Sequence, residues 1–217
     1  MVACLDRDRV AVERVAAEIA DRGGRSVALV ADVTDVAAVA RQVGDITAAH
    51  GAVGILVNNA GVPGAGRFRD ITFDDWQRVM DVHVSGAFHV TKAVLPGMLA
   101  QRWGRIVNIA SESVWLGNQS VQYVTAKAAL VGFTRALAHQ LAADGILVNA
   151  VAPGPVDTPM LHDNDPAALD AELATVRIGR WLAPDEIAAT IAFLAGPGGD
   201  AYVGQVLSPN GGTVFPG

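Results

Sequence analysis

Short apolar runs alternate along the chain with longer segments in which apolar residues recur every three or four positions. Continuous apolar runs bounded by turn residues are typical of buried strands, and the longer periodic segments are typical of helices. We predict strands over residues 2–5, 26–31, 55–57, 105–110, 146–152 and 205–207. We predict helices over residues 9–21, 35–50, 74–101, 121–143 and 184–195. The helix over 74–101 contains Pro96, where we expect it to bend.

This alternation predicts an α/β fold with a parallel sheet that is covered by helices on both faces. Right-handed crossovers then give a doubly wound, Rossmann-like sheet that binds ligands beyond the carboxyl ends of its strands. We expect residues 1–217 to form a single domain. The segment over residues 153–178 is rich in Pro, Asp and Asn. We interpret it as a substrate lid with short helices, and a plain surface excursion is the alternative.

Composition narrows the class of protein. The 217 residues are 51% apolar and 18% charged, which excludes a disordered chain. Polar side chains interrupt every stretch of about 18 residues, so no membrane span is expected. The net charge of −6 and the lack of a basic run argue against nucleic acid as a partner. The single cysteine, Cys4, and an N-terminus without a signal-peptide core predict a cytoplasmic protein.

Candidate chemistry begins with Tyr123 and Lys127, which stand four positions apart at the start of a predicted helix. They should project from one face, where the lysine cation would lower the pKa of Tyr123 and make it a usable acid or base. Ser111 follows a predicted strand and could hydrogen-bond a carbonyl oxygen in the same site. Ser113 is the alternative to Ser111. The competing interpretation is a half-buried tyrosine beside a surface lysine, with the serine in a turn.

These residues belong to a set of sequence blocks that resembles the classical short-chain dehydrogenase/reductase family. In order, the blocks are Asp32-Val33, Asn58-Asn59-Ala60-Gly61, Ser111, Tyr123-x-x-x-Lys127 and the segment 149–158 with Pro153-Gly154, Val156 and Thr158. The resemblance covers essentially the whole chain. It implies an NAD(P)-dependent oxidoreductase that interconverts a secondary alcohol and a ketone by hydride transfer.

The resemblance also implies a role for each residue of the site. Tyr123 would transfer the proton to or from the substrate oxygen, Lys127 would lower the pKa of Tyr123 and bind the nicotinamide ribose, and Ser111 would orient the substrate. His83 stands where the family usually has an asparagine that completes a proton relay through water. Histidine can donate and accept there too, so His83 could carry the relay. The alternative is a structural histidine satisfied by a backbone group.

Cofactor contacts follow from the same resemblance. They are expected at Asp6, Asp32, Val33, Asn58, Ala60, Gly61, Tyr123, Lys127, Pro153, Gly154, Val156 and Thr158. Asp6 ends the first predicted strand, where a carboxylate would bind the adenosine ribose and repel a 2′-phosphate. This favours NAD, while the neighbouring Arg7 keeps NADP open as the alternative. Asp32 could also cap the helix that follows it.

Residues expected to line the substrate pocket are Ser113, Trp115, Gln119 and Met160. Apolar residues around the site favour a secondary alcohol or ketone, for example a 3-oxoacyl thioester. The alternatives are a sugar or polyol dehydrogenase and a degenerate, non-catalytic relative that serves as a binding subunit. The histidines have no metal-ligand spacing, so no catalytic metal is expected. The family usually forms homotetramers through its two longest helices, here 74–101 and 121–143, and a homodimer is the other expectation.

One family feature is not found in the sequence. The family begins with a strand and a Thr-Gly-x-x-x-Gly-x-Gly turn, whereas this chain begins at what resembles the second strand. We therefore expect a first strand-helix unit of about 30 residues to be missing. Its strand would lie between the strands at 2–5 and 54–57, which would leave two strand edges without partners and the pyrophosphate without its cradle. We interpret the glycines at 61, 64 and 66 as part of a loop.

Overall fold

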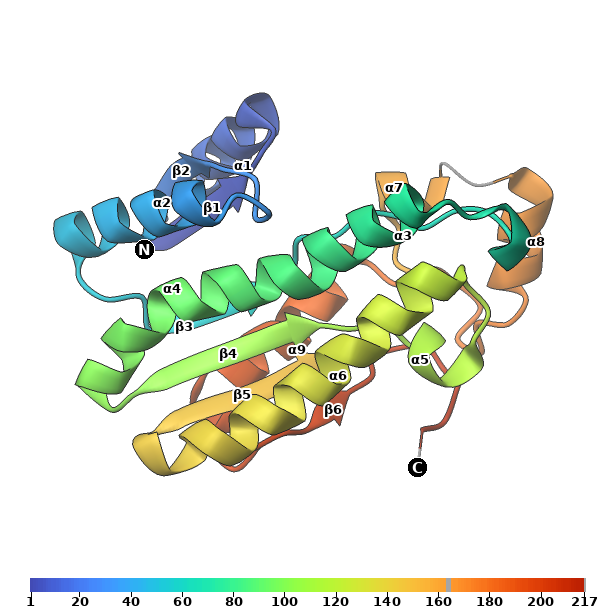
Figure 1. Ribbon diagram of the computed structural model, residues 1–217. Helices are drawn as coiled ribbons and strands as arrows, with labels where there is room; N and C mark the ends of the chain where they lie inside the picture. The colour runs from blue at the N-terminus through green and yellow to red at the C-terminus, as the bar shows by residue number, and fades with distance from the viewer. Residues whose placement is uncertain (163–164, 217) are drawn as a thin grey trace.

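A computed structural model describes residues 1–162 and 165–216, in which parallel strands alternate with helices (Figure 1). The strands are β1 (Val2–Asp6), β2 (Ser26–Val30), β3 (Ile55–Asn58), β4 (Gly104–Ile109), β5 (Ile146–Val151) and β6 (Val206–Leu207). The α-helices are α1 (Arg9–Asp21), α2 (Val36–His50), α3 (Phe73–Met80), α4 (Gly86–Gln101), α5 (Ser113–Leu116), α6 (Val121–Leu141), α7 (Pro159–His162), α8 (Pro166–Leu173) and α9 (Pro184–Ala195). The predicted alternation of strands and helices is confirmed.

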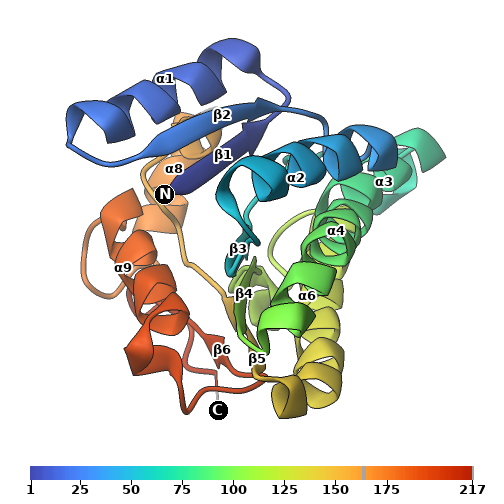
Figure 2. The same ribbon diagram turned by 90° about the vertical axis from the view of Figure 1, so that its left-hand side faces the viewer.

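The strands form two parallel sheets. In the first, β1 pairs with β2, with Asp6 opposite Val30. The larger sheet has the order β3-β4-β5-β6. Figure 2 shows β1, β2 and α1 set apart from β3, and we call these three elements the N-terminal unit. Within the described residues, the facing edges of β1 and β3 have no strand partner.

The core lies on both faces of the two central strands of the larger sheet. Helices α4 and α6 cover one face and α9 covers the other (Figure 2). Because side chains alternate along a strand, Ile106 packs toward α4 and α6, and its neighbour Val107 packs toward α9. Both side chains are at most 1% exposed. The carboxyl ends of β4 and β5 are thus held on a rigid, fully packed base.

Helix α2 joins the N-terminal unit to the larger sheet. Its side chains Val39 and Val43 belong to the same core cluster as Val94 and Met98 of α4. The helix begins at an aspartate, Asp35, whose carboxylate accepts a hydrogen bond from the backbone of the first turn and so caps it. The pairing of α2 with α4 therefore sets where the N-terminal unit lies relative to the site.

The predicted helix over 74–101 is interrupted in the structure. A π-helical turn, Asp81–Ser85, separates α3 from α4, and it carries His83. Helix α4 continues through Pro96 to Gln101. The apolar periodicity gave no sign of the π-helical turn, because one extra residue per turn hardly changes a pattern of this length.

Two strands, β1 and β3, are less buried than the sequence predicts. The expectation that every strand is covered on both faces holds for β4 and β5 but is wrong for β1 and β3. Ile55 and Val57 of β3 are 46% and 37% exposed. The physical reason is that β3, in the described part of the chain, has a strand partner on only one side.

The predicted lid over residues 153–178 contains α7 and α8. Its residues 163 and 164 lie outside the described part of the chain. Within residues 1–162 and 165–216, none of the helices combines the length and apolar character that a membrane crossing requires.

Candidate active site

The three residues expected to react meet beyond the carboxyl end of β4. Ser111 follows the last residue of β4 by two positions, and its hydroxyl hydrogen-bonds the phenol of Tyr123 in the first turn of α6. Lys127, one turn further along α6, donates from Nζ to the carbonyl oxygen of Ile109 at 2.8 Å. Its Nζ lies 5.5 Å from the centre of the Tyr123 ring. The spacing seen in the sequence therefore does bring these side chains together.

Burial dominates the electrostatics of this group. It raises the pKa of Tyr123, and the hydrogen bond from Ser111 offsets only part of that rise. The expectation that Lys127 lowers the pKa of Tyr123 is therefore wrong for this structure. Lys127 is 5% exposed, and burial lowers its own pKa to about 8. Both groups are thus held in an environment that disfavours charge.

His83 lies next to Tyr123. The two rings meet edge to face, with centroids 5.6 Å apart. The Nε2 atom of His83 is 3.0 Å from the backbone nitrogen of Val62 and 2.9 Å from its carbonyl oxygen. Its Nδ1 atom is buried and has no hydrogen-bond partner among residues 1–162 and 165–216. Burial, together with the charge of Lys127, lowers the pKa of His83 to about 4, so the ring is neutral at pH 7.

The segment after β3 is a loop, as interpreted from its glycines. An added Cβ at Gly61 would lie 2.6 Å from Cε1 of His83, so only glycine fits between this loop and the histidine. Asn58 donates from its side-chain amide to Thr91 at 3.1 Å and to Asn108 at 2.8 Å. The side chain of Asn58 is therefore bonded within the protein. Backbone groups at Asn58, Ala60 and Gly61 lie at the edge where the cofactor is expected.

At the other end of the expected cofactor site are the residues after β1 and β2. Asp32 accepts hydrogen bonds from the backbone nitrogen and hydroxyl of Thr34, and these bonds lower its pKa. Arg7 lies 3.7 Å from the Asp32 carboxylate, between Nη1 and Oδ2. Val33 packs against α4, where its carbonyl oxygen is 2.9 Å from Nδ1 of His89. Asp6 and Asp32 both lie at the carboxyl end of the smaller sheet.

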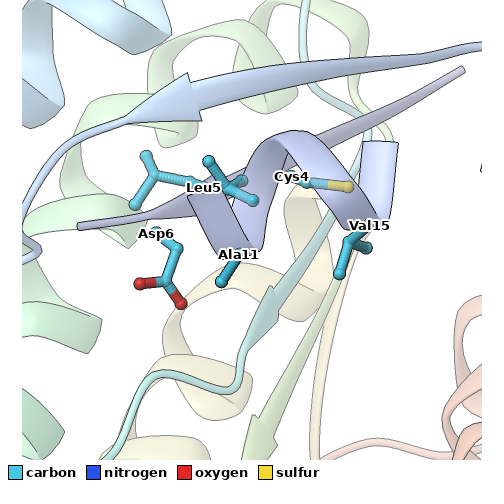
Figure 3. Close-up of a pocket in the computed structure, with 6 residues that line it drawn as sticks. Cys4, Leu5, Asp6, Ala11 and Val15 are labelled. Carbon is cyan, nitrogen blue, oxygen red and sulfur yellow. The ribbon is translucent and has the colours of Figure 1, made fainter. Parts of the chain in front are cut away.

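Asp6 lines a pocket of about 190 Å³ beside α1 (Figure 3). Figure 3 shows its carboxylate and the side chains of Ala11 and Val15 pointing to the same side of the N-terminal unit. One carboxylate oxygen of Asp6 accepts a hydrogen bond from the backbone nitrogen of Asp8 at 2.9 Å. An acidic group thus faces a pocket at the strand end where the sequence predicts the adenosine ribose.

The segment after β5 reaches the same edge of the larger sheet. The backbone nitrogen of Gly154 donates to Pro209 at 3.1 Å, and an added Cβ at Gly154 would lie 2.7 Å from Cα of Asn210. Val156 pairs with Leu182 in an isolated bridge, and the hydroxyl of Thr158 donates to the carbonyl oxygen of Val156 at 3.3 Å. Pro153 opens this segment, which runs directly into the lid.

The residues expected at the substrate pocket fall into two groups. Ser113 is 1% exposed, and its backbone nitrogen donates to the hydroxyl oxygen of Ser111 at 3.2 Å. Trp115 and Met160 are 40% and 46% exposed, and Gln119 is exposed in the loop after α5. Ser113 therefore positions Ser111 from the interior, while the other three lie at the surface.

The arrangement fits a nicotinamide dinucleotide at its reacting end. An ammonium group has three N–H donors, and within the described residues one donor of Lys127 is used, by Ile109. A buried cation with open donors is costly unless a ligand completes its hydrogen bonds. The two hydroxyls of a ribose supply acceptors of that kind. For a metal ion, the described residues contain no cluster of histidine, cysteine and carboxylate ligands.

Two buried polar residues at the site, Glu112 and Gln122, were not predicted from the sequence. Glu112 and Gln122 are 6% and 0% exposed, and Gln122 donates to the carbonyl oxygen of Ala65 in the loop after β3. The position of Glu112 between Ser111 and Ser113, directly after a buried strand, was a usable signal for the first. Gln122 carried none, because a single amide on a helix is not informative.

Comparison with known proteins places the chain among oxidoreductases. A family model described as enoyl-(acyl carrier protein) reductase matches residues 1–214. A subunit of (2S)-[(R)-hydroxy(phenyl)methyl]succinyl-CoA dehydrogenase from Thauera aromatica is 42% identical over 217 residues, covering 98% of this chain and 86% of that protein. A 3-oxoacyl-[acyl-carrier-protein] reductase from Synechocystis sp. is 38% identical over 209 residues, covering 94% of this chain and 83% of that protein.

A solved structure is similar over nearly the whole fold. The crystal structure of a gluconate 5-dehydrogenase from Burkholderia cenocepacia J2315, in complex with NADP and tartrate, superimposes with a TM-score of 0.91. The two chains are 31% identical, and the match covers 97% of this chain and 84% of that one.

Proposed function

The chain belongs to the short-chain dehydrogenase/reductase family and is an NAD(P)-dependent oxidoreductase that interconverts a secondary alcohol and a ketone, and on that premise we propose which residues carry the reaction. The observation that supports the assignment most directly is the contact between the Ser111 hydroxyl and the Tyr123 phenol, with Lys127 one turn away. A non-catalytic binding subunit would not need this contact between two hydroxyls, whereas a substrate carbonyl oxygen could accept from both.

Tyr123 is the proposed acid and base. It gives its proton to the substrate oxygen during reduction and takes a proton from it during oxidation. Ser111 orients that oxygen: the backbone nitrogen of Ser113 donates to the Ser111 oxygen, and the hydroxyl proton, directed to Tyr123, would turn to the substrate oxygen that binds between them. Lys127 would bind the nicotinamide ribose through the Nζ donors that Ile109, its one acceptor among the described residues, leaves open. The nicotinamide cofactor, when bound, supplies or accepts the hydride.

His83 is the proposed next member of the proton path. Its ring is neutral at pH 7 because its pKa is lowered to about 4. A neutral imidazole has one donor and one acceptor nitrogen, so His83 can bond the Val62 backbone through Nε2 and accept a hydrogen bond at Nδ1. This supports a role for His83 in the proton relay that the family's usual asparagine completes. The relay contact would be the Nδ1 acceptor of the ring in place of a side-chain amide.

We propose that residues 1–217 form a single domain with two cofactor-binding regions. One region would bind the adenosine end of the dinucleotide, and the other would bind the nicotinamide end. Asp6, Asp32 and Val33 would hold the adenosine part. The backbone at Asn58, Ala60 and Gly61, together with Tyr123 and Lys127, would hold the nicotinamide ribose, and Pro153, Gly154, Val156 and Thr158 would hold the nicotinamide. Their common position at the carboxyl ends of the strands supports this arrangement.

NAD is the proposed preference. The Asp6 carboxylate would repel a 2′-phosphate, and Arg7 is directed to Asp32, 3.7 Å away. NADP remains the alternative, supported by the NADP bound in the gluconate 5-dehydrogenase structure.

The proposed substrate is a 3-oxoacyl thioester or a related ketone. Exposed apolar residues near the site support it, among them Trp115 at 40% and Met160 at 46% exposed. Two relatives are named for reactions on acyl-CoA or acyl-carrier-protein substrates. A sugar or polyol substrate is the second candidate, favoured by the gluconate 5-dehydrogenase match. The lid over 153–178 would close over either.

We also propose that the protein is cytoplasmic and forms a homotetramer or homodimer through α4 and α6. The free thiol of Cys4 supports a reducing compartment. Exposed apolar side chains on both helices, Phe88 at 52% and Val121 at 41%, support a further interface there.

The test is steady-state turnover of NADH and NADPH with a 3-oxoacyl thioester and with a keto sugar acid. We expect Tyr123→Phe to lower kcat by about a thousandfold, because general acid catalysis is lost. Binding of the reduced cofactor, followed by nicotinamide fluorescence, should stay close to that of the unmodified chain.

The matched control is Tyr202→Phe, which changes the chain's other tyrosine. Tyr202 packs against Phe193 on the side of the sheet covered by α9, so its removal should leave turnover intact. Full activity of Tyr123→Phe would contradict the proposed mechanism.

A further inference from the structure

The two proposed cofactor regions lie on different parts of the fold, and their separation has to match the length of a dinucleotide. The turn after β2, with Asp32 and Val33, is proposed for the adenosine part, and the loop after β3, with Ala60 and Gly61, for the nicotinamide ribose. In the described residues strand pairing does not set this separation, because the facing edges of β1 and β3 have no strand partner there. Other contacts must therefore hold the two regions at a fixed distance.

One short stretch of the chain contacts both regions. Residues 83–89 run from the π-helical turn into the first turn of α4, and we call them the bridge segment. At its beginning, Nε2 of His83 lies 2.9 Å from the carbonyl oxygen of Val62 in the loop after β3. At its end, Nδ1 of His89 donates to the carbonyl oxygen of Val33 at 2.9 Å. The bridge segment thus joins the turn after β2 to the loop after β3.

The contact between the bridge segment and Val33 is close as well as polar. An added Cβ at Gly86 would lie 2.6 Å from Cγ2 of Val33, so the Val33 side chain approaches the helix at a position where glycine leaves room for it. Gly86 itself is buried. The ring of His89 meets the ring of Phe88 edge to face, with centroids 6.0 Å apart. The first turn of α4 therefore holds Val33 by both its carbonyl oxygen and its side chain.

This contact is a second point of attachment for the N-terminal unit. Helix α2 packs through Val39 and Val43 against Val94 and Met98, which lie in the second half of α4. The bridge segment holds Val33 at the opposite end of the same helix. A single attachment leaves a rotation free, whereas two separated attachments fix an orientation. Together they fix the distance between the adenosine region and the nicotinamide region.

We propose that His89 is a positioning residue, which through Val33 holds the adenosine region at the distance from the nicotinamide region that a dinucleotide needs. The inference rests on the proposed assignment of these two cofactor regions. A dinucleotide bound at one end meets the second region at a high effective concentration only when the spacing fits. His89 provides this fit from outside the reacting group, so it acts on cofactor affinity and not on proton transfer at Tyr123.

The experiment compares a ligand that spans both regions with ligands that occupy one region each. His89→Leu removes the donor to Val33, and we expect it to weaken NADH binding, followed by nicotinamide fluorescence, about tenfold. AMP carries the adenosine end alone, and reduced nicotinamide mononucleotide carries the other end. Both should bind within about twofold of their affinity for the unmodified chain, by NMR titration and by fluorescence respectively. Turnover at saturating NADH should keep its kcat within about twofold.

Three further variants complete the series. His89→Asn restores a donor, because the asparagine amide places an N–H on the same Cγ atom as the imidazole, and NADH affinity should return to within about threefold of the unmodified chain. His50→Leu makes the matched change at the exposed end of α2 and should leave all three affinities unchanged. Gly86→Ala acts from the other side, since its methyl group displaces Val33, and should weaken NADH binding more than AMP binding.

Equal losses of NADH and AMP affinity in His89→Leu would overturn the proposal, because they would show a local effect on the adenosine region in place of an effect on spacing. Unchanged NADH affinity in His89→Leu would overturn it as well, as would a failure of His89→Asn to restore binding. Retained turnover in Tyr123→Phe, measured in the same series, would instead contradict the proposed function. The ratio of NADH affinity to AMP affinity does not depend on turnover, so it still decides whether His89 sets the spacing.

Discussion

The larger sheet and the N-terminal unit bury their strands to different extents. In the larger sheet, Ile106 and Val148 are 0% exposed, and every residue of β4 is buried. In the N-terminal unit, β1 has no buried residue, and Val10 and Val15 of α1 are 77% and 40% exposed. One region is a packed core, and the other is a small layer attached to it through α2.

The chemistry is divided in the same way. Ser111, Tyr123, Lys127 and His83 come from β4, α6 and the π-helical turn, all packed on the larger sheet. Burial there is what shifts the pKa of Lys127 to about 8 and that of His83 to about 4. The groups proposed for the adenosine come from the N-terminal unit, where hydrogen bonds from Thr34, more than burial, set the pKa of Asp32. The reacting groups are thus fixed by packing, and the adenosine groups by local bonds.

The first test of this contrast truncates one apolar side chain in each region. Ile106→Ala should lower the free energy of unfolding by about 3 kcal/mol, because it leaves a cavity in a rigid core. Val15→Ala, the matched change in the N-terminal unit, should cost less than about 0.5 kcal/mol, because its side chain is already half in water. Chemical denaturation followed by circular dichroism measures both. Equal losses would show that the two regions are equally packed.

Most of the fold could be predicted because the chain alternates two clear periods. Helices α1 and α9 begin and end at the predicted residues, since Asp8 caps the first and Pro184 opens the second. The apolar runs of β1 and β3 gave no sign of their exposure, because an apolar run looks the same whether one or both edges have partners. The order of the sequence blocks alone predicted that these two edges lack a partner. Short elements such as α5 were also missed, since four residues carry no periodic signal.

The candidate site also has features that the sequence predicted and features that it did not. The contact of Ser111 with Tyr123 and Lys127 follows from helix geometry and strand ends, so spacing was enough. The direction of the Tyr123 pKa did not follow, because burial is a property of the whole fold and outweighs one neighbouring charge. Glu112 and Thr213 stand 101 positions apart, a contact that no local pattern can reveal.

The second test measures how the stability of the larger sheet depends on pH through the titration of His83. His83 has a pKa of about 4 when folded against 6.5 when unfolded, so the unfolded state takes up a proton first as pH falls. Its contribution to stability is complete above pH 6.5 and should decline by about 2 kcal/mol on acidification to about pH 5. Denaturation curves against pH should show this slope flattened in His83→Asn. His50→Asn, at the exposed end of α2, should keep the original slope. A slope unchanged in His83→Asn would mean that the ring is not held neutral.

The smallest expected effect lies in the N-terminal unit and concerns the choice of cofactor. Asp6→Asn keeps the acceptor at the end of β1 but removes the charge that would repel a 2′-phosphate, so the affinity ratio of NADPH to NADH should rise about tenfold. Asp21→Asn, at the far end of α1, removes the same charge away from the pocket and should leave the ratio unchanged. Fluorescence titration with each cofactor measures the ratio, and kcat at saturating cofactor should not move. A change in kcat alone would mean that the N-terminal unit acts on the reacting groups as well, because a residue that only selects the cofactor has no path to the proton transfer at Tyr123.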